Sequence, residues 1–442
     1  DPKEFCESAK RVLKESEADF AWLYEASDPA GEPGAIRYII WSEVLVCPSC
    51  GERTTYWDAA VRLDPAAIDA DYECPHCNSV NHTASCRRVT QATACGSPGD
   101  CREQRLRVPV RVYGQTGSVK WQREANLTDS KLIEAVEASE IDDWYPSQNI
   151  NWGDLHRRGY HQGIGRFCDF YTRRNLMAFA RLWRGIESQP SHLRDALRVW
   201  ALSFNASHST LMTRVVAKTG QTDLVQTGAQ SGVLYVSSLP VEKNVFEGLR
   251  RKIKVFAEAF ALAFTSASRV QVVNESSTRL ALDDGSVDYV FTDPPFGGFI
   301  PYAELNQVNE AWLGKFTDTS EEAIISPAQG KEVSDYQRLL IDVFSEVERV
   351  LAYSGLVTVV FHSSKPEVWS AIGEAFDHAG LAVKEASILD KTQPSFKQVV
   401  SSNGSRGDAL MLLAPSRREQ TAHAPRTGVL IDSVIRQACE GG

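Results

Sequence analysis

Two periods of apolar positions alternate along the C-terminal half of the chain. Short apolar runs bounded by turn residues predict buried strands, and the longer segments between them repeat apolar positions every three or four residues, as amphipathic helices do. Strands are expected at 270–274, 287–292, 356–361, 381–389 and 408–413, and helices at 275–282, 335–351 and 367–379. This order predicts an α/β fold with a mostly parallel sheet.

The N-terminal half has a less regular pattern. We expect a helix at 4–23, strands from 36 to 46, and, after an aromatic loop at 145–165, helices at 167–183 and 241–264. The segment 126–268 is therefore mainly helical, and it is also rich in arginine. These patterns divide the chain into an N-terminal region at 1–125, the helical segment at 126–268, the α/β part at 269–415 and a tail at 416–442.

One tetrapeptide carries the clearest chemical signal. Asp293-Pro294-Pro295-Phe296 directly follows the apolar strand predicted at 287–292. Each proline fixes its own φ and pushes the preceding residue into extended conformation, so the Asp293 carboxylate and the neighbouring carbonyls are held in one geometry. Two such acceptors can orient a planar exocyclic amine and stabilise the positive charge that forms on its nitrogen. Phe296 offers a face on which a base can stack.

The motif, the strand before it, Gly297-Gly298 after it and the strand–helix order over about 270–415 resemble the amino-methyltransferases. These enzymes use S-adenosylmethionine to methylate the exocyclic nitrogen of adenine or cytosine. The chain is most similar to large bacterial adenine-specific DNA methylases with zinc-binding insertions, and Asp293 at the first motif position favours adenine N6. The resemblance implies a Rossmann-like methyltransferase sheet in the C-terminal half, DNA as partner, and a role in restriction-modification or phage defence.

The resemblance also assigns roles to single residues. Asp293, Pro294, Pro295 and Phe296 form the catalytic corner, onto which the target base swings out of the duplex. The later motifs imply that the flipped base is contacted by Lys391, Ser395 and Phe396. The cofactor is expected to contact Thr172, Glu275 and Ser276. By pattern alone, the helix at 167–183 that contains Thr172 is equally an amphipathic core helix.

One expected part of such an enzyme is missing from the sequence. No glycine-rich loop follows a strand before Val270, although a cofactor loop of this fold needs close backbone approach to its ligand. The chain also opens with Asp1. We therefore expect a missing N-terminal segment or another chain to supply that loop, and the alternative is a degenerate methyltransferase that does not bind the cofactor.

Four of the ten cysteines form two C-x-x-C motifs, Cys47 with Cys50 and Cys74 with Cys77. Two such motifs separated by some two dozen residues match a zinc ribbon, in which four thiolates hold one structural Zn²⁺. Unpaired buried cysteines or a redox motif are the alternatives. A second, less regular site could combine His82 with Cys86, Cys95 and Cys101.

Composition and charge restrict the function further. The 442 residues carry a net charge of −10, which argues against a protein that coats DNA indiscriminately. Two regions are nevertheless rich in arginine and are candidate DNA-backbone surfaces, the alternative being solvated helix faces: Arg87, Arg88, Arg102, Arg105, Arg107, Arg111, Lys120 and Arg123, then Arg157, Arg158, Arg166, Arg173, Arg174, Arg181 and Arg184. The absence of long apolar stretches and of a secretory signal predicts a cytoplasmic protein without a membrane partner.

Three functions remain open at this point. The first is a DNA adenine-N6 methyltransferase. The second is a methyltransferase that acts on RNA or on a protein amide, and the third is a catalytically silent DNA-binding subunit.

Overall fold

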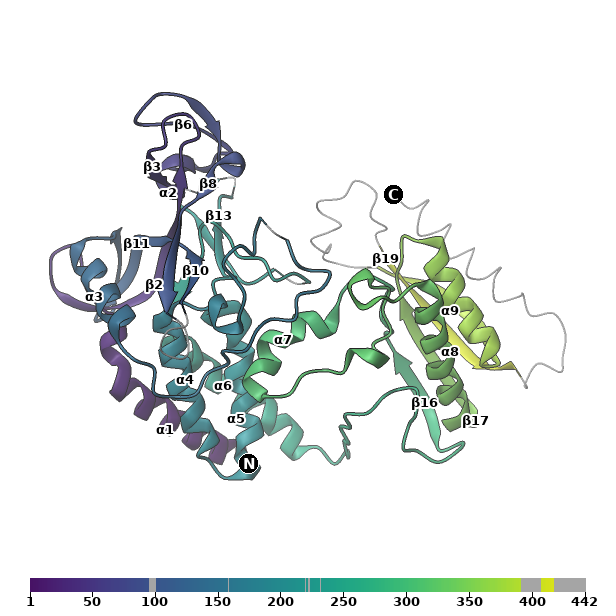
Figure 1. The fold of residues 1–442 in the computed structure, drawn as a ribbon. Coiled ribbons are helices and arrows are strands. Elements are labelled where there is room, and N and C mark those ends of the chain that lie inside the picture. Colours follow the sequence, from purple (N-terminus) through teal and green to yellow (C-terminus); the bar gives the residue numbers. More distant parts are fainter. Residues whose placement is uncertain are drawn as a thin grey trace. The chain divides into compact units, whose positions relative to one another are not determined.

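The computed structural model describes residues 1–94, 101–157, 159–218, 220–221, 223–230, 232–390 and 407–416. These residues form two compact units. The first comprises Asp1–Arg269 and Leu305–Thr317, and the second comprises Val270–Glu304 and the described residues from Asp318 onward. Both units combine helices and sheets, so the α/β class is confirmed at this level (Figure 1).

The first unit is built on an antiparallel sheet around the long strand β2 (Pro33–Val46). The strand order is β1-β2-β11-β12, with β1 at Glu25–Ser27, β11 at Arg107–Thr116 and β12 at Val119–Glu124. Other stretches of β2 pair with β3 (Arg53–Thr55), β8 (Arg87–Arg88) and β15 (Val241–Lys243). Strand β2 therefore links the sheet to the cysteine-bearing hairpins that follow it.

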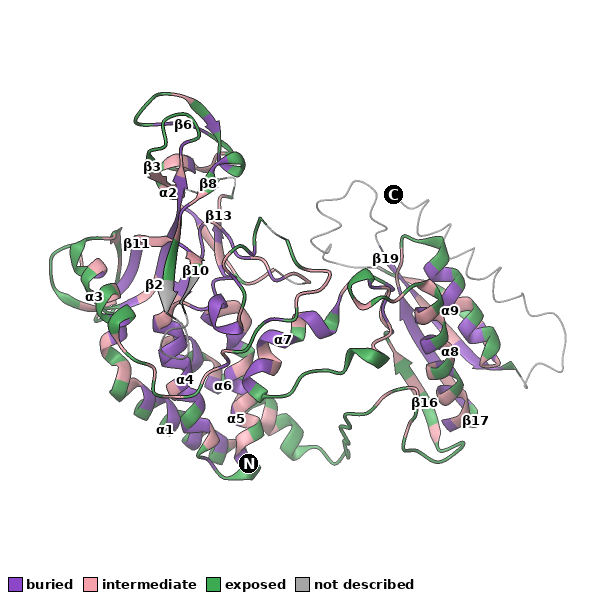
Figure 2. Ribbon diagram, in the orientation of Figure 1, coloured by how far each residue is buried: buried purple, intermediate pink, exposed green. Residues whose placement is uncertain are grey.

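Helices cover the core of this unit, as the buried residues in Figure 2 show. They are α1 (Pro2–Phe20), α3 (Leu127–Ala138), α4 (Arg173–Glu187), α5 (Ser191–Phe204), α6 (Val245–Thr265) and most of α7 (Tyr302–Leu313). Helix α4 begins at the N-cap Thr172 and buries an apolar face. The core joins residues from both halves of this unit, among them Phe5, Phe179, Trp200, Phe246 and Trp312.

The smaller elements of the first unit surround this framework. They are η1 (Ala21–Tyr24), α2 (Tyr56–Ala60), β4 (Val61–Leu63), β5 (Ala66–Ile68), β6 (Asp71–Glu73), β7 (Val80–His82), η2 (Thr83–Ser85), β9 (Thr90–Ala94), β10 (Cys101–Arg105), η3 (Phe167–Phe170), η4 (Asn205–Ser209), β13 (Arg214–Val216) and β14 (Val225–Thr227). No described helix of the chain is both long and apolar enough to cross a bilayer.

The second unit contains a four-stranded sheet with the order β16-β17-β19-β18. Strands β16 (Val287–Thr292) and β17 (Leu351–Phe361) are parallel, and β19 (Gly407–Pro415) runs antiparallel to both β17 and β18 (Leu381–Asp390). The prediction of a mostly parallel sheet is therefore wrong for the described strands, because β19 lies between β17 and β18 and runs opposite to both. Helices α8 (Val333–Val350) and α9 (Pro366–His378) pack against each other, with Phe344 and Phe376 edge to face at 4.7 Å. Short helical turns lie at η5 (Thr319–Glu321) and η6 (Pro327–Gln329).

Most strands and helices expected in this unit form close to their predicted bounds, but the first pair does not. The strand expected at 270–274 and the helix expected at 275–282 are wrong, since these residues form exposed coil with one turn. Val270 and Val272 are 83% and 91% exposed. An apolar run becomes a strand only beside another strand that accepts its backbone hydrogen bonds, and no described strand pairs with this segment.

Two helices of the first unit begin later in the structure than the sequence predicts. The helix expected at 241–264 starts with strand β15, because Val241–Lys243 pairs with β2, and α6 begins only after the N-cap Asn244. The helix expected at 167–183 is divided into η3 and α4 by the extended residues Tyr171 and Thr172. In both places a capping side chain sets the true start.

Candidate functional site

The four cysteines of the two C-x-x-C motifs come together in the first unit. Their Sγ atoms all lie within 4.8 Å of one another, and the Cys47–Cys77 and Cys50–Cys74 pairs are each 3.8 Å apart. A tetrahedral zinc with Zn–S bonds of ~2.3 Å would separate its sulfurs by about 3.8 Å. The cluster is therefore a site that could hold a metal ion, and the prediction that these four residues gather is confirmed.

Both motifs use the same local backbone geometry. The Gly51 N–H donates to the Cys47 carbonyl and the Asn78 N–H donates to the Cys74 carbonyl, each at 2.9 Å. Gly51 and Asn78 both have positive φ, which glycine and asparagine adopt most easily. Each motif thus forms the turn of a hairpin, β2–β3 or β6–β7, and directs two thiols to one side. The Cys50 backbone N–H lowers the pKa of the Cys47 thiol to about 5, against the effect of burial.

The less regular second site is not formed by the described residues. Nδ1 of His82 accepts a hydrogen bond from the Ala84 N–H, and the Cys86 thiol donates to the His82 carbonyl. Cys95 and the Cys101 side chain lie outside the described residues. Among described residues, the four-cysteine group is the only cluster suited to a metal.

The Asp293-Pro294-Pro295-Phe296 corner begins where strand β16 ends, at Thr292. Asp293 is exposed and Pro294 is buried, so the backbone of the corner is anchored while the carboxylate faces solvent. The Tyr336 hydroxyl, on α8, donates to the Pro295 carbonyl at 2.5 Å. Burial, followed by the charge of Asp293, raises the pKa of Tyr302. The Asp293 carboxylate is therefore exposed and still close enough to Tyr302 to influence its pKa.

The residues after the corner fix the orientation of Phe296. The Phe296 ring lies edge to face against Phe361 at 5.3 Å. Gly297 has φ +66°, and a Cβ there would lie 3.1 Å from Val368 Cγ2 and 3.2 Å from Ile325 Cδ1. A side chain at this position would meet both a strained backbone and close packing. The corner is thus held from α8, from β17 and from the residues around Val368.

Of the other predicted site residues of this unit, the structure describes Glu275 and Ser276. Glu275 is exposed, and Ser276 forms a turn in which its hydroxyl lies 2.8 Å from that of Thr278. Lys391, Ser395 and Phe396 lie outside the described residues. Nothing in the described part of this unit therefore assembles the predicted substrate and cofactor contacts around Asp293.

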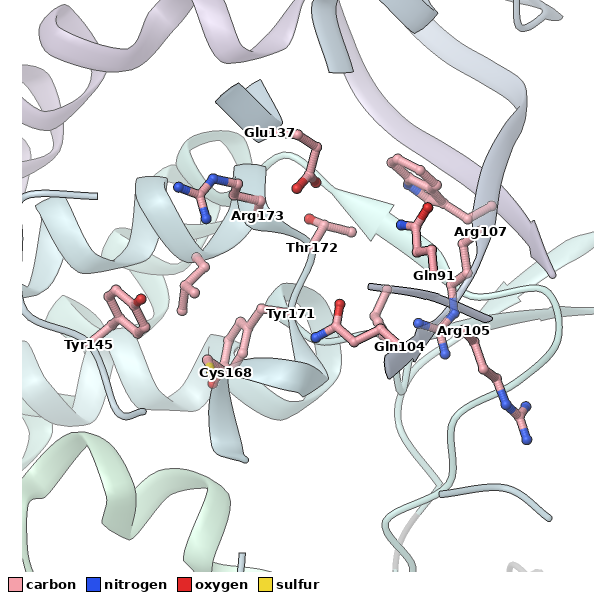
Figure 3. A pocket seen from close by; sticks show the side chains of 13 residues that line it. Gln91, Gln104, Arg105, Arg107, Glu137, Tyr145, Cys168, Tyr171, Thr172 and Arg173 are labelled. Atoms are coloured by element: carbon pink, nitrogen blue, oxygen red, sulfur yellow. The ribbon is translucent and has the colours of Figure 1, made fainter. Parts of the chain in front are cut away.

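Thr172 belongs to the first unit, where it lines a cavity of about 110 Å³ (Figure 3). Its hydroxyl accepts a hydrogen bond from the Asn175 N–H and donates to Glu242 at 2.5 Å. Figure 3 shows Glu137 and Arg173 near Thr172, and Gln91, Gln104 and Arg107 across the cavity. Burial raises the pKa of Glu137 and lowers that of Arg107. Charges of both signs thus border this cavity.

A buried carboxylate organises the arginines on the far side of the cavity. Glu43 is fully buried and accepts hydrogen bonds from Arg105 at 2.5 Å, from Ser238 at 2.8 Å and from Arg88 at 3.3 Å. Arg107 Nη2 lies 3.8 Å from the same carboxylate. Burial alone would raise the pKa of Glu43, but the charges of Arg105 and Arg107 hold it below its ordinary value. The only sequence signal for this group is one acid within an apolar run.

This cluster corrects part of the predicted DNA surface. Arg88, Arg105 and Arg107 point inward to Glu43, and Arg174 is buried against Glu242 at 3.1 Å. Arg123 pairs with Asp129, Arg181 with Asp19, and Arg184 with Asp143. A guanidinium removed from water needs a carboxylate beside it, so the arginines paired with Glu43 and Glu242 serve internal pairing, whereas Arg184 is 69% exposed and its pair lies at the surface.

In comparisons with known proteins, no family model and no curated protein matches this chain.

Proposed function

We propose that the chain is a methyltransferase that moves a methyl group from S-adenosylmethionine to N6 of adenine in DNA. The observation that carries the proposal is the Asp293 corner, where an accessible carboxylate follows a strand and is held by buried backbone. Such a carboxylate is an acceptor that need not reorganise when charge develops on a substrate nitrogen.

The Pro294 and Pro295 carbonyls of the corner have different roles in this proposal. Tyr336 engages the Pro295 carbonyl, so the proposal assigns the Pro294 carbonyl, together with Asp293, to the two N–H bonds of the amine. Phe296 would support the flipped base, since its edge-to-face contact with Phe361 fixes the ring plane. Positioning and electrostatics then supply the acceleration, without a covalent enzyme intermediate.

The sheet of the second unit supports the fold expected from the resemblance. A parallel pair β16–β17 carries the corner at a carboxyl end, where ligands of open α/β sheets bind. Strand β16 pairs only with β17 among the described strands, and Tyr289 and Phe291 on it are 53% and 63% exposed. Parallel strands are normally covered on both faces. This exposed edge is consistent with a further segment or chain that completes a Rossmann-like sheet and brings the glycine-rich loop.

The residues predicted for the cofactor fit it only in part. Arg107, Arg173 and Glu137 border the cavity beside Thr172, but Arg107 faces Glu43 and Arg173 donates to the Ser139 carbonyl, so the charges that could hold an amino-acid group are already partly engaged. Glu275 is exposed, and the half-buried Ser276 hydroxyl is engaged with Thr278 within its own turn. When bound, S-adenosylmethionine would supply the methyl group, and this chain's own residues would orient the acceptor amine.

The cysteine cluster would hold one structural Zn²⁺. The sulfur separations of 3.8 Å fit a tetrahedron, and four thiolates leave no open position for water. The ion would then fix the two hairpins that follow β2 and β6. One zinc per purified chain, lost in Cys74→Ser, is the expected metal analysis.

A methyl-transfer assay tests the function. The purified protein, with any chain that co-purifies, is given S-adenosylmethionine with a labelled methyl group and duplex DNA, RNA or protein. We expect incorporation into DNA, with a loss of about 10²–10³-fold in Asp293→Asn, because the negative charge is lost and one acceptor oxygen becomes an NH2 donor. Asp288→Asn, at an exposed position of the same strand, is the matched control and should retain activity.

The alternatives predict other results. If the labelled methyl group is incorporated preferentially into RNA or into a protein amide, that molecule and not DNA is the substrate. No incorporation into any substrate, with DNA binding retained, would identify the silent DNA-binding subunit, which the incomplete cofactor contacts favour. Full activity of Asp293→Asn would exclude the role given to this carboxylate.

A further inference from the structure

A second cavity of the first unit, of about 270 Å³, is lined by an excess of cationic side chains. It lies where β2, β15 and the start of α6 meet, because Lys243 on β15 is paired with Tyr38 on β2. Asn244 then caps α6, and its backbone N–H donates to the Arg37 carbonyl at 2.9 Å. The lining contains the cations Arg37, Lys243, Arg251 and Lys252 and one carboxylate, Glu247.

These four cations make no ion pair with the acidic residues that the structure describes. Within the described parts of the chain, none of them lies within 4.0 Å of an Asp or Glu oxygen. Lys252 Nζ donates instead to the carbonyl and hydroxyl of Ser203, at 2.9 and 3.3 Å. Four cations gathered beside the single carboxylate Glu247 repel one another, so an anion in this cavity would relieve that repulsion.

The electrostatics of the neighbouring groups agree with this excess of positive charge. Burial, followed by the charge of Arg251, lowers the pKa of Lys243 to about 8. Burial, followed by Lys243, Lys252 and Arg251, lowers the pKa of His208 to about 3. The neutral His208 ring stacks on Phe204 at 4.2 Å, and its Nδ1 is buried without a hydrogen-bond partner. Among the described residues, His208 Nδ1 is therefore a polar atom beside this cavity that a ligand could pair with.

Local structure keeps the cations together. Glu247 and Arg251 are four residues apart and so lie along one side of the start of α6, and Lys243 is the last residue of β15, directly before the N-cap Asn244. The N-terminus of this 21-residue helix adds a partial positive charge at the same place. Gly248 lets α6 approach α5 closely, since a Cβ there would lie 1.7 Å from the Phe204 ring. The packing of two helices and a strand thus fixes the shape of the cavity.

We propose that this cavity binds a phosphate group, either free or carried by a nucleotide or a nucleic-acid strand. A phosphate presents charge and several acceptor oxygens to ammonium and guanidinium groups at once, which matches the four cations. The cavity is much larger than the ~30 Å³ share of one water molecule, so the anion and part of its attached group fit. The inference uses only the first unit and does not depend on the proposed methyl transfer.

Lysine labelling of the full chain tests the proposal directly. Near pH 8 about half of an amine with a pKa of about 8 is neutral, so it reacts with acylating reagents much faster than ordinary lysines, which are almost fully protonated there. A bound phosphate favours the charged ammonium and covers it. We therefore expect inorganic phosphate, adenosine monophosphate or a short oligodeoxynucleotide to protect Lys243 from labelling, read by mass spectrometry of the digested protein.

A charge-matched pair of variants supplies the control. Lys243→Gln/Arg251→Gln should weaken binding of the protecting probe at least tenfold, measured by calorimetry, since two charge-assisted contacts are lost. Arg250→Gln/Lys254→Gln likewise removes one arginine and one lysine, both on α6 outside the cavity, where Arg250 pairs with Glu17 and Lys254 with Glu258, and this variant should bind normally.

The pattern of protection identifies the source of the phosphate. Protection by inorganic phosphate and the mononucleotide indicates a free-anion or nucleotide site, and protection by the oligonucleotide alone indicates a strand. Unchanged labelling of Lys243 with all three probes would overturn the proposal, as would equal binding by the two double variants.

Discussion

Glu43 lies within the apolar strand β2 and Asp293 directly follows the apolar strand β16, yet the two carboxylates have opposite surroundings. Glu43 is fully buried in β2, where Arg88, Arg105 and Ser238 donate to it and Arg107 lies close. Asp293 follows β16 at an exposed position, and it is the backbone of the next residues that is buried and bonded. The first carboxylate is fixed by its side-chain partners, and the second is fixed by its backbone.

Because of this difference, we interpret Glu43 as a structural charge and Asp293 as a charge that a substrate can reach. A buried carboxylate compensated by guanidinium groups has little capacity left for a ligand, and removing it leaves those cations unpaired. An exposed carboxylate on a rigid corner adds little to stability but keeps acceptor capacity. The comparison therefore predicts effects on stability at Glu43 and on chemistry at Asp293.

The largest expected effect is that of Glu43→Gln. The substitution keeps the shape but leaves the buried arginines without their counter-charge, at a cost of about 3–5 kcal/mol. Native-state hydrogen exchange of β2 and β11 measures the loss locally. The control is Asp69→Asn, which breaks the exposed pair with Arg62 and should cost much less. Equal losses in the two variants would show that the Glu43 cluster is not stabilising.

Acidification should remove part of the same stabilisation. The folded state lowers the pKa of Glu43 below its ordinary 4.5, so this contribution is complete above about pH 4.5 and is lost as the pH falls through the lower folded value. Glu43→Gln lacks this titration. The stability difference between wild type and variant should therefore narrow on acidification, measured by denaturant unfolding at several pH values, and a widening would mean that the pKa is raised.

A smaller effect is expected at Gly297, which supports the Asp293 corner. Gly297→Ala places a side chain at φ +66°, which costs about 1–2 kcal/mol, and it also crowds Val368 and Ile325. Gly285→Ala is the matched control, since Gly285 has φ +64° and open space around a Cβ. Denaturant unfolding should show a larger loss at Gly297. If the two losses were equal, packing around the corner would contribute nothing to its rigidity.

The smallest effect on stability is expected for Asp293→Asn. The carboxylate is exposed, so the free energy of unfolding should change by no more than about 0.5 kcal/mol. The same variant should lose methyl transfer, as described above. Thermal unfolding measured beside the activity assay separates the two properties, and a large drop in stability would place Asp293 with Glu43 as a structural charge.

Features encoded within a few residues were predictable from the sequence. The C-x-x-C motifs close their own turns through bonds from Gly51 to Cys47 and from Asn78 to Cys74, so the pairing of thiols within each motif needs no distant partner. The position of Asp293 at a strand end was predictable for the same reason, because the two prolines set the local backbone. Neighbouring residues determine such geometry through short-range sterics and hydrogen bonds.

Only the tertiary structure decided which charges are compensated and which apolar runs find partners. Glu43 meets Arg88 and Arg105 across 45 and 62 residues, and the basic cavity joins Arg37 to Lys243 and Arg251, so arginine density along the chain could not distinguish internal pairs from an open site. The apolar run at 270–274 has strand character in sequence but no described neighbour. Charge compensation and strand pairing depend on contacts between distant segments, and these exist only once the chain has folded.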